Sequence, residues 1–149
     1  MSYEKLTTEL FQVREQREQR RIQANQYMDQ TLIYLSLNIP GPDKQPTGVE
    51  KLFGWGLRQV LELLPMVESC SHGRDLLGTW ALLGTCQNAR KIKREAVELE
   101  NSTPAGRLLN IDIYDPRGRK IGRTELGFSA RSCLVCNDVI ADCVQLQCL

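Results

Sequence analysis

Apolar and polar positions alternate along the chain with two different periods, which mark candidate helices and strands. Residues 4–30 are rich in Glu, Gln and Arg, contain neither Gly nor Pro, and space their first apolar side chains along one side, so they predict a helix. Residues 32–39 alternate between apolar and polar side chains, which is the period of a strand. The two prolines and the glycine of residues 40–42 end that strand.

The middle of the chain predicts a helix and a second strand. Thr47 and Glu50 have the spacing of a capping box, and apolar residues at helical spacing follow them until Pro65. Residues 68–78 form a looser stretch. Residues 79–83 are a short apolar run, which we interpret as a strand.

The last third predicts a helix followed by a hairpin. Apolar residues recur at intervals of three and four from Ala89 onward, and this helix must end before Pro104. Residues 109–114 alternate as a half-buried strand with its polar side chains on one face. Residues 115–118 are a strong turn signal, after which residues 120–125 can return as the second arm.

Length and charge narrow the class of protein. A chain of 149 residues fits a single α+β domain over residues 1–149. A net charge of +1 argues against a protein that grips nucleic acid through a dominant basic field. The N-terminus has no apolar signal segment, and no apolar run approaches the ~18 residues of a membrane span. We therefore expect a cytoplasmic protein that binds neither nucleic acid nor a membrane.

Asn110 and Asp112 are candidate ligands for a hard cation. Oxygen ligands two residues apart on a strand project from the same face, where they can hold magnesium and present it to phosphates. Arg107 lies just before them and could neutralise phosphate charge. The alternative is a strand that simply exposes its polar face to water.

Four cysteines gather in the last seventeen residues of the chain. Cys133 and Cys136 have the spacing of a zinc knuckle, and Cys143 and Cys148 follow without repeating it. A structural zinc site held by Cys133, Cys136 and Cys143 is one interpretation. Unligated thiols, which behave as small apolar side chains, are the other.

Basic residues are the third candidate group. Arg14, Arg17 and Arg21 share one helical face, and Lys91, Lys93 and Arg94 lie on another helix, but the interleaved glutamates favour solvated surfaces there. The segment 107–131 is a stronger candidate for binding an anion, because it holds six basic and three acidic residues. Lys44 follows a predicted strand end, where a substrate site or a plain turn would each explain it.

Short motifs then recur in one order along nearly the whole chain. They are Arg14-Glu15-x-Arg17, Asn38-Ile39-Pro40-Gly41-Pro42-Asp43-Lys44, Val97-Glu98-Leu99-Glu100, Pro104-x-Gly106-Arg107-Leu108, Ile111-Asp112-Ile113, and Gly127 followed by Arg131-Ser132-Cys133-Leu134-Val135-Cys136 with Cys143. In this order and spacing the chain resembles the apo-citrate lyase phosphoribosyl-dephospho-CoA transferase family. That resemblance implies a nucleotidyltransferase-like mixed sheet with flanking helices and a Cys-rich C-terminal tail.

The resemblance also implies an activity and its partners. Such enzymes transfer phosphoribosyl-dephospho-CoA from a triphosphoribosyl-dephospho-CoA donor to a serine of the citrate lyase acyl carrier protein, releasing pyrophosphate. It implies that Asp112, Asn110 and Arg107 are catalytic, with magnesium on the first two. The implied substrate-binding residues are Lys44, Arg17, Arg123, Arg131 and Gly106, and Glu100 is a further candidate carboxylate.

Two departures from the family pattern leave an alternative open. Asn110 stands where the pattern has Asp, so a negative charge is lost and metal affinity should fall. The chain also stops short of the typical family length. The alternative is a catalytically impaired homologue, acting as a binding module for the carrier protein or the lyase complex, with a Cys-rich and zinc-stabilised element.

Overall fold

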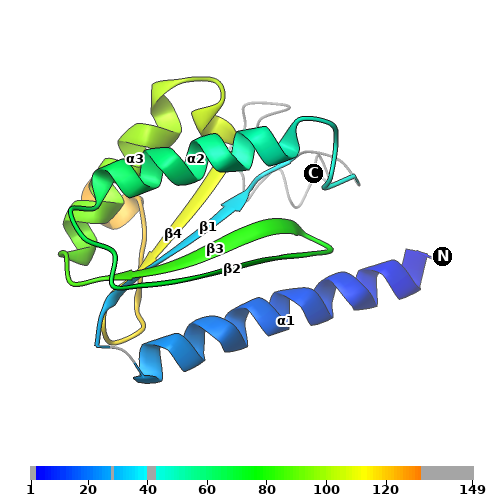
Figure 1. Cartoon of the computed structure of the whole chain (residues 1–149), viewed down its shortest axis with the longest axis horizontal. Coiled ribbons are helices and arrows are strands. Elements are labelled where there is room, and N and C mark those ends of the chain that lie inside the picture. Colours follow the sequence, from blue (N-terminus) through cyan, green and yellow to red (C-terminus); the bar gives the residue numbers. More distant parts are fainter. Residues whose placement is uncertain (1–2, 28, 40–42, 132–149) are drawn as a thin grey trace.

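The computed structural model of the chain describes residues 3–27, 29–39 and 43–131, and it places five strands in one sheet (Figure 1). In chain order the main elements are α1 (Tyr3–Tyr27), β1 (Thr31–Leu37), α2 (Val49–Leu63), β2 (Ser69–Asp75), β3 (Gly78–Thr85), α3 (Ala89–Ser102), β4 (Leu109–Tyr114) and β5 (Lys120–Ile121). Two short 3-10 turns, η1 (Gly106–Leu108) and η2 (Thr124–Leu126), flank the β4–β5 hairpin. The predicted α+β fold is confirmed.

The sheet has the order β2-β3-β1-β4-β5, and all its pairings are antiparallel, where a mixed sheet was expected. The reason lies in the two helical connections. The helix α2 links β1 to β2 and α3 links β3 to β4, so each connection joins parallel strands that are separated by one antiparallel strand. This βαββαβ connection is the ferredoxin-like, or split βαβ, topology.

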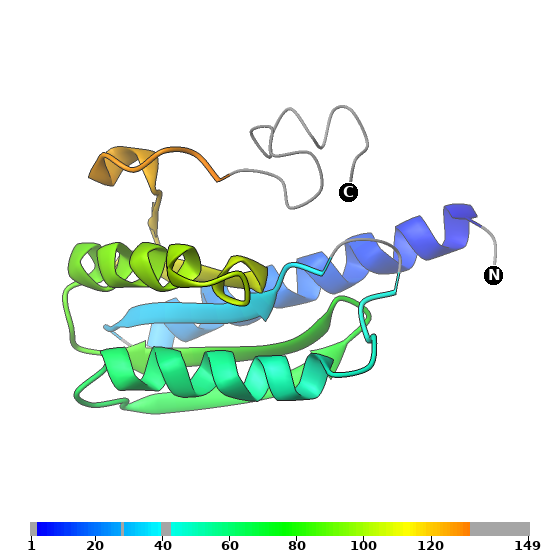
Figure 2. The same ribbon diagram turned by 90° about the horizontal axis from the view of Figure 1, so that it is seen from above.

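Helices cover both faces of the sheet (Figures 1 and 2). The helices α2 and α3 pack on one face over a core that includes Ile33, Leu83 and Ile111. The helix α1 lies on the other face, where Leu32 and Trp80 belong to a second apolar cluster. The strand β1 is therefore buried on both sides, although its sequence alternates like that of a half-exposed strand.

Three arginines of α1 hold that helix to the sheet, although it has few apolar residues. Arg17 pairs with Asp75 through two bonds, from Nε at 2.8 Å and Nη2 at 2.7 Å. The guanidinium carbon of Arg20 lies 4.0 Å from the Trp80 ring centre, and that of Arg21 lies 4.3 Å from the centre of Tyr114. The expected solvated arginine face is thus wrong for Arg17 and Arg21, because aromatic and acidic partners from distant strands cover them.

The helix predictions hold apart from one cap. The helix α2 begins after Gly48, whose φ of 91° turns the chain into the helix without a side-chain cap, so the capping box at Thr47 and Glu50 is wrong. Glu50 instead pairs with Arg74. The helix α3 is capped by Asn88, whose side chain accepts from the Lys91 N–H at 3.0 Å. Within the described residues, no helix is both long enough and apolar enough to cross a membrane.

The strands differ from expectation at both edges of the sheet. The looser stretch 68–78 contains β2, which pairs with β3 from Ser69 to Asp75. As an edge strand it is largely exposed, so its sequence carries no apolar alternation. The return arm of the hairpin is short: β5 has two residues, and the chain then turns into η2.

Candidate functional site

The outer edge of β4 is where the predicted site residues meet. The strand β5 pairs only with Ile113 and Tyr114, so charged side chains reach the backbone of the first part of β4. The Ile111 N–H donates to Glu100 Oε2 at 3.2 Å, and Lys93 Nζ donates to the Ile111 carbonyl at 2.9 Å. Arg131 Nη2 donates to the carbonyl of Leu109. These side chains supply the hydrogen bonds that a neighbouring strand would otherwise make.

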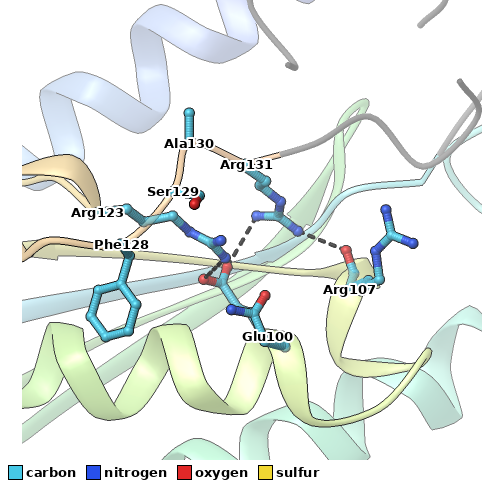
Figure 3. Close-up of a pocket in the computed structure, with 8 residues that line it drawn as sticks. Glu100, Arg107, Arg123, Phe128, Ser129, Ala130 and Arg131 are labelled. Atoms are coloured by element: carbon cyan, nitrogen blue, oxygen red, sulfur yellow. Dashed lines mark hydrogen bonds and ion pairs between the residues drawn. The ribbon is translucent and has the colours of Figure 1, made fainter. Parts of the chain in front are cut away.

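Glu100 is the centre of this arrangement (Figure 3). Its side chain is 2% exposed in the last turn of α3. Arg123 donates from Nη2 to Glu100 Oε1 at 2.7 Å, and Arg131 donates from Nη1 to Oε2 at 3.0 Å. Arg131 also donates to the Arg107 carbonyl at 2.7 Å, which brings the three arginines together. We call Glu100, Arg107, Arg123 and Arg131 the arginine site.

Positive charge exceeds negative charge in the arginine site, because two guanidinium groups share one carboxylate. Burial lowers the pKa of Arg131, and the nearby charges of Arg123 and Arg107 act in the same direction, whereas Glu100 opposes them. Burial also lowers the pKa of Lys93, with Glu100 acting against that shift. A low-dielectric cluster with surplus cations is suited to binding an anion.

Two hollows open beside these arginines. One of about 320 Å³ lies between the segment 127–131 and the end of α3. Glu100, Arg107, Arg123 and Arg131 line it together with Asn101 and the residues Phe128, Ser129 and Ala130 (Figure 3). The second hollow, of about 400 Å³, shares Glu100, Arg123 and Arg131 with the first and extends to Asn110, Asp112, Lys93 and Lys120. The structure thus brings together five of the predicted site residues: Arg107, Asn110, Asp112, Arg123 and Arg131.

Asn110 and Asp112 project from one face of β4, as their spacing predicts. Asp112 Oδ1 lies 3.2 Å from Lys120 Nζ. The Asn110 amide donates to Ser36 Oγ at 3.3 Å, and its oxygen accepts from Arg131 at 3.4 Å. In the described part of the chain no three His, Cys, Asp or Glu side chains gather as a metal site. Carboxylate and amide oxygens are ligand types that magnesium accepts, and here each of the two has a cationic neighbour, Lys120 for Asp112 and Arg131 for Asn110.

Arg17 and Lys44, two of the predicted substrate-binding residues, are engaged by the protein itself. Arg17 borders a smaller hollow on the α1 side of Asp112, but its guanidinium is held by Asp75 and by the Gly78 carbonyl at 3.0 Å. Lys44 donates to the Ile39 carbonyl at 2.7 Å, and burial lowers its pKa.

Gly106 is buried, and the structure explains it by packing. A Cβ on Gly106 would lie 2.4 Å from the Leu99 carbonyl oxygen, so the glycine lets η1 pass close to the end of α3. This contact sets the position of Arg107, the next residue in η1. The cysteines predicted to hold zinc, Cys133, Cys136 and Cys143, lie outside the described residues.

Lys93 and Glu100 contribute more to the cluster at the edge of β4 than expected from the sequence. We expected Lys93 in a solvated face, but it is 5% exposed, because it lies on the apolar side of α3 beside Ile92 and Ala96. Glu100 follows seven residues later, two helical turns on, and therefore lies on the same side. That spacing was the available signal. Lys91 and Arg94 are exposed, as expected.

The fold and this cluster define an α+β domain with an arginine-lined hollow at one sheet edge. A family model for apo-citrate lyase phosphoribosyl-dephospho-CoA transferase matches residues 6–147, and the chain belongs to that family. The resemblance seen in the motifs is confirmed.

Curated relatives carry the same family name. The apo-citrate lyase phosphoribosyl-dephospho-CoA transferase of Escherichia coli O139:H28 is 28% identical over 118 residues, which are 76% of this chain and 64% of the relative. The protein of that name from Shigella boydii serotype 18 is 27% identical over the same shares. The chain thus matches 64% of the length of these relatives.

Proposed function

We propose that this chain transfers the phosphoribosyl-dephospho-CoA group from triphosphoribosyl-dephospho-CoA to a serine of the citrate lyase acyl carrier protein. The observation that carries the proposal is the arginine site, in which Arg107, Arg123 and Arg131 line one hollow within a family of such transferases. Three guanidinium groups around a hollow complement the negative charge of a triphosphate, since one guanidinium group can bind two phosphate oxygens at once.

The chemistry requires stabilisation of negative charge more than it requires a nucleophile from the protein. The serine oxygen forms a bond to the inner phosphorus, the bond from that phosphorus to pyrophosphate breaks, and the serine proton passes to water. Charge on the phosphate oxygens and on the leaving pyrophosphate rises during this step. Arg107, Arg123 and Arg131 would bind those oxygens, because preformed donors stabilise the charge that develops in the transition state.

Asp112 and Asn110 would hold a magnesium ion that accompanies the donor. The ion would supply neutralisation of phosphate charge, and the two side chains would orient it from one face of β4. In the structure Lys120 forms an ion pair with the carboxylate of Asp112. When the donor binds, Lys120 would leave that carboxylate and contact a phosphate group instead. We retain Arg17 and Lys44 as sequence-based candidates only, since their cationic groups already have partners within the protein.

The test is a transfer assay with purified protein, donor, magnesium and apo carrier protein. Mass spectrometry of the carrier should show one added phosphoribosyl-dephospho-CoA group, located on a single serine. Asp112→Ala should lower the rate by at least about 100-fold if the carboxylate acts in the chemical step. Full activity of Asp112→Ala would refute its role, and an unmodified carrier with wild-type protein would refute the proposed transfer.

A carrier-binding module without transfer activity is the second candidate. Asn110 favours it, because its amide is bonded to Ser36 and Arg131 and leaves Asp112 as the one carboxylate on that face of β4 among the described residues. Carrier binding without transfer, with transfer restored by Asn110→Asp, would support this module. Zinc analysis of the full chain tests its Cys-rich element separately. One zinc per chain would support a zinc-bound element, and folded protein without zinc would refute it.

A further inference from the structure

We propose that Glu100 is a positioning residue for phosphate binding, which orients Arg123 and Arg131 toward the hollow that Arg107 also lines. This inference rests on the proposed function, because it concerns how the same site holds the triphosphate. Glu100 does not meet the substrate in this scheme. It acts through the two guanidinium groups that its carboxylate binds.

The first support is geometric. The two oxygens of Glu100 are divided between the arginines: Oε1 accepts from Arg123, and Oε2 accepts from Arg131 and from the Ile111 N–H. The bond to the backbone of β4 fixes the carboxylate to the sheet. Because Arg123 precedes η2 and Arg131 follows it by several residues, the carboxylate joins both ends of the 123–131 segment to the sheet (Figure 3).

The second support is the number of donors that remain. A guanidinium group has five N–H donors. Within the described residues, Arg123 uses one nitrogen on Glu100, and Arg131 uses two nitrogens on Glu100, Asn110 and two backbone carbonyls. Both side chains border the hollow, so the donors that Arg123 keeps are available there to phosphate oxygens.

The third support is charge. Without the carboxylate, three guanidinium groups would repel one another around the hollow, and the 123–131 segment would lose its ion pairs to α3. With the carboxylate, the site keeps a positive surplus but holds the cations in a fixed arrangement. A merely structural ion pair would balance its charges, as Arg17 and Asp75 do on the other face of the sheet.

The experiment compares Glu100→Gln with Asp75→Asn as a matched control. Both variants remove the charge of a carboxylate that binds an arginine and a backbone N–H, since Asp75 also accepts from the Leu77 N–H at 2.9 Å. Calorimetry would measure the binding of inorganic tripolyphosphate at a temperature where circular dichroism shows both variants folded. We expect Glu100→Gln to weaken binding about 10-fold and Asp75→Asn to stay within about 2-fold of the wild type.

Steady-state kinetics supply a second readout that a loss of stability would not move. Glu100→Gln should raise KM for the donor while KM for the carrier protein stays unchanged. Equal tripolyphosphate affinities of wild type and Glu100→Gln, or no binding by the wild type, would overturn the inference. If Glu100→Gln does not fold, Glu100→Asp replaces it. That variant retains the charge one methylene further away and should bind tripolyphosphate more weakly than the wild type, whereas wild-type affinity would again overturn the inference.

Failure of this inference and failure of the proposed function are distinguishable, because tripolyphosphate binding needs no carrier protein. A wild-type chain that binds tripolyphosphate through Glu100-positioned arginines but modifies no carrier would refute the transfer and leave the positioning role standing. If the wild type modifies the carrier but Glu100→Gln binds tripolyphosphate as tightly as the wild type, the positioning role is refuted and the transfer stands.

Discussion

The molecule contains two groups of arginines that differ in the partners they contact. The α1 arginines face the sheet: Arg17 pairs with Asp75, Arg20 lies over the Trp80 ring, and Arg21 lies over the Tyr114 ring and pairs with Glu18. At the edge of β4, Arg123 and Arg131 share the single carboxylate of Glu100. In the first group each ion pair has a carboxylate of its own, whereas in the second group two guanidinium groups share one carboxylate.

This difference distinguishes arginines that attach α1 to the sheet from arginines proposed to bind a ligand. A guanidinium over an aromatic ring, or paired one-to-one with a carboxylate, stabilises the contact of a polar helix with a sheet and leaves little charge for a ligand. A shared carboxylate leaves charge uncompensated, and the hollows open on that side of β4. The sharing of carboxylates, more than the number of arginines, therefore supports the β4-edge group as the proposed anion-binding group.

Removing each carboxylate should give the largest contrast between the two groups. Glu100→Ala leaves two arginines and the Ile111 N–H without their acceptor at a 2% exposed position, and we expect a loss of about 3–5 kcal/mol in the free energy of unfolding. Asp75→Ala acts at a 15% exposed side chain and should cost about 1–2 kcal/mol. Urea unfolding followed by circular dichroism measures both. Equal losses would mean that the two carboxylates do the same structural work.

A glycine beneath the arginine site offers the next test. Gly106→Ala places a methyl group 2.4 Å from the Leu99 carbonyl oxygen, so η1 must move away from α3 and take Arg107 with it. We expect about 1–3 kcal/mol of destabilisation and weaker tripolyphosphate binding. Gly54→Ala is the control, because its methyl group would meet only the far end of Arg58 at 3.8 Å and would favour the helix. Unchanged stability in Gly106→Ala would refute the packing role.

The elements with strong periodicity were predictable from the sequence, and the partners of the charged residues were not. The strand β4 shows its alternation plainly, so Asn110 and Asp112 could be placed on one face. The strand β2 could not be found, because it is an exposed edge strand with polar side chains. Arg17 illustrates the second limit: its partner Asp75 is 58 residues away, and no local pattern records the pair.

Lys93 and Arg94 show how far the sequence predicts the environment of a charged side chain. They are adjacent cations in one helix, yet Lys93 is buried against β4 and Arg94 is exposed, because successive residues point about 100° apart around the helix. The apolar stripe of α3 predicts which of the two faces inward. It does not predict that the ammonium group will bond to the Ile111 carbonyl of β4, because that carbonyl lacks a partner in a neighbouring strand only as a result of the shortness of β5.

Exchanging one arginine from each group sharpens the comparison at the level of binding. Arg123→Ala removes one of the proposed phosphate-binding groups and should weaken tripolyphosphate binding about 10-fold. Arg20→Ala removes the same charge from the other face of the sheet and should change that binding less than about 2-fold. Calorimetry at fixed ionic strength measures both. Equal weakening would mean that the net charge of the chain, not the arginine site, attracts the anion.

Lys93 gives the smallest expected effect and the most specific one. Burial lowers its pKa below the ordinary 10.5; Glu100 and Asp112 oppose that shift, and Arg123 and Lys120 add to it. Between the lowered pKa and 10.5 the unfolded chain binds more protons at this position, so the stability of the wild type should rise with pH relative to Lys93→Met. The gain is about 1.4 kcal/mol for each unit by which the pKa differs between the two states. Urea unfolding at several alkaline pH values measures it, with the exposed Lys91→Met as the control. A pH-independent difference between wild type and Lys93→Met would mean that the buried ammonium keeps its ordinary pKa, and that the negative charges at the β4 edge fully compensate its burial.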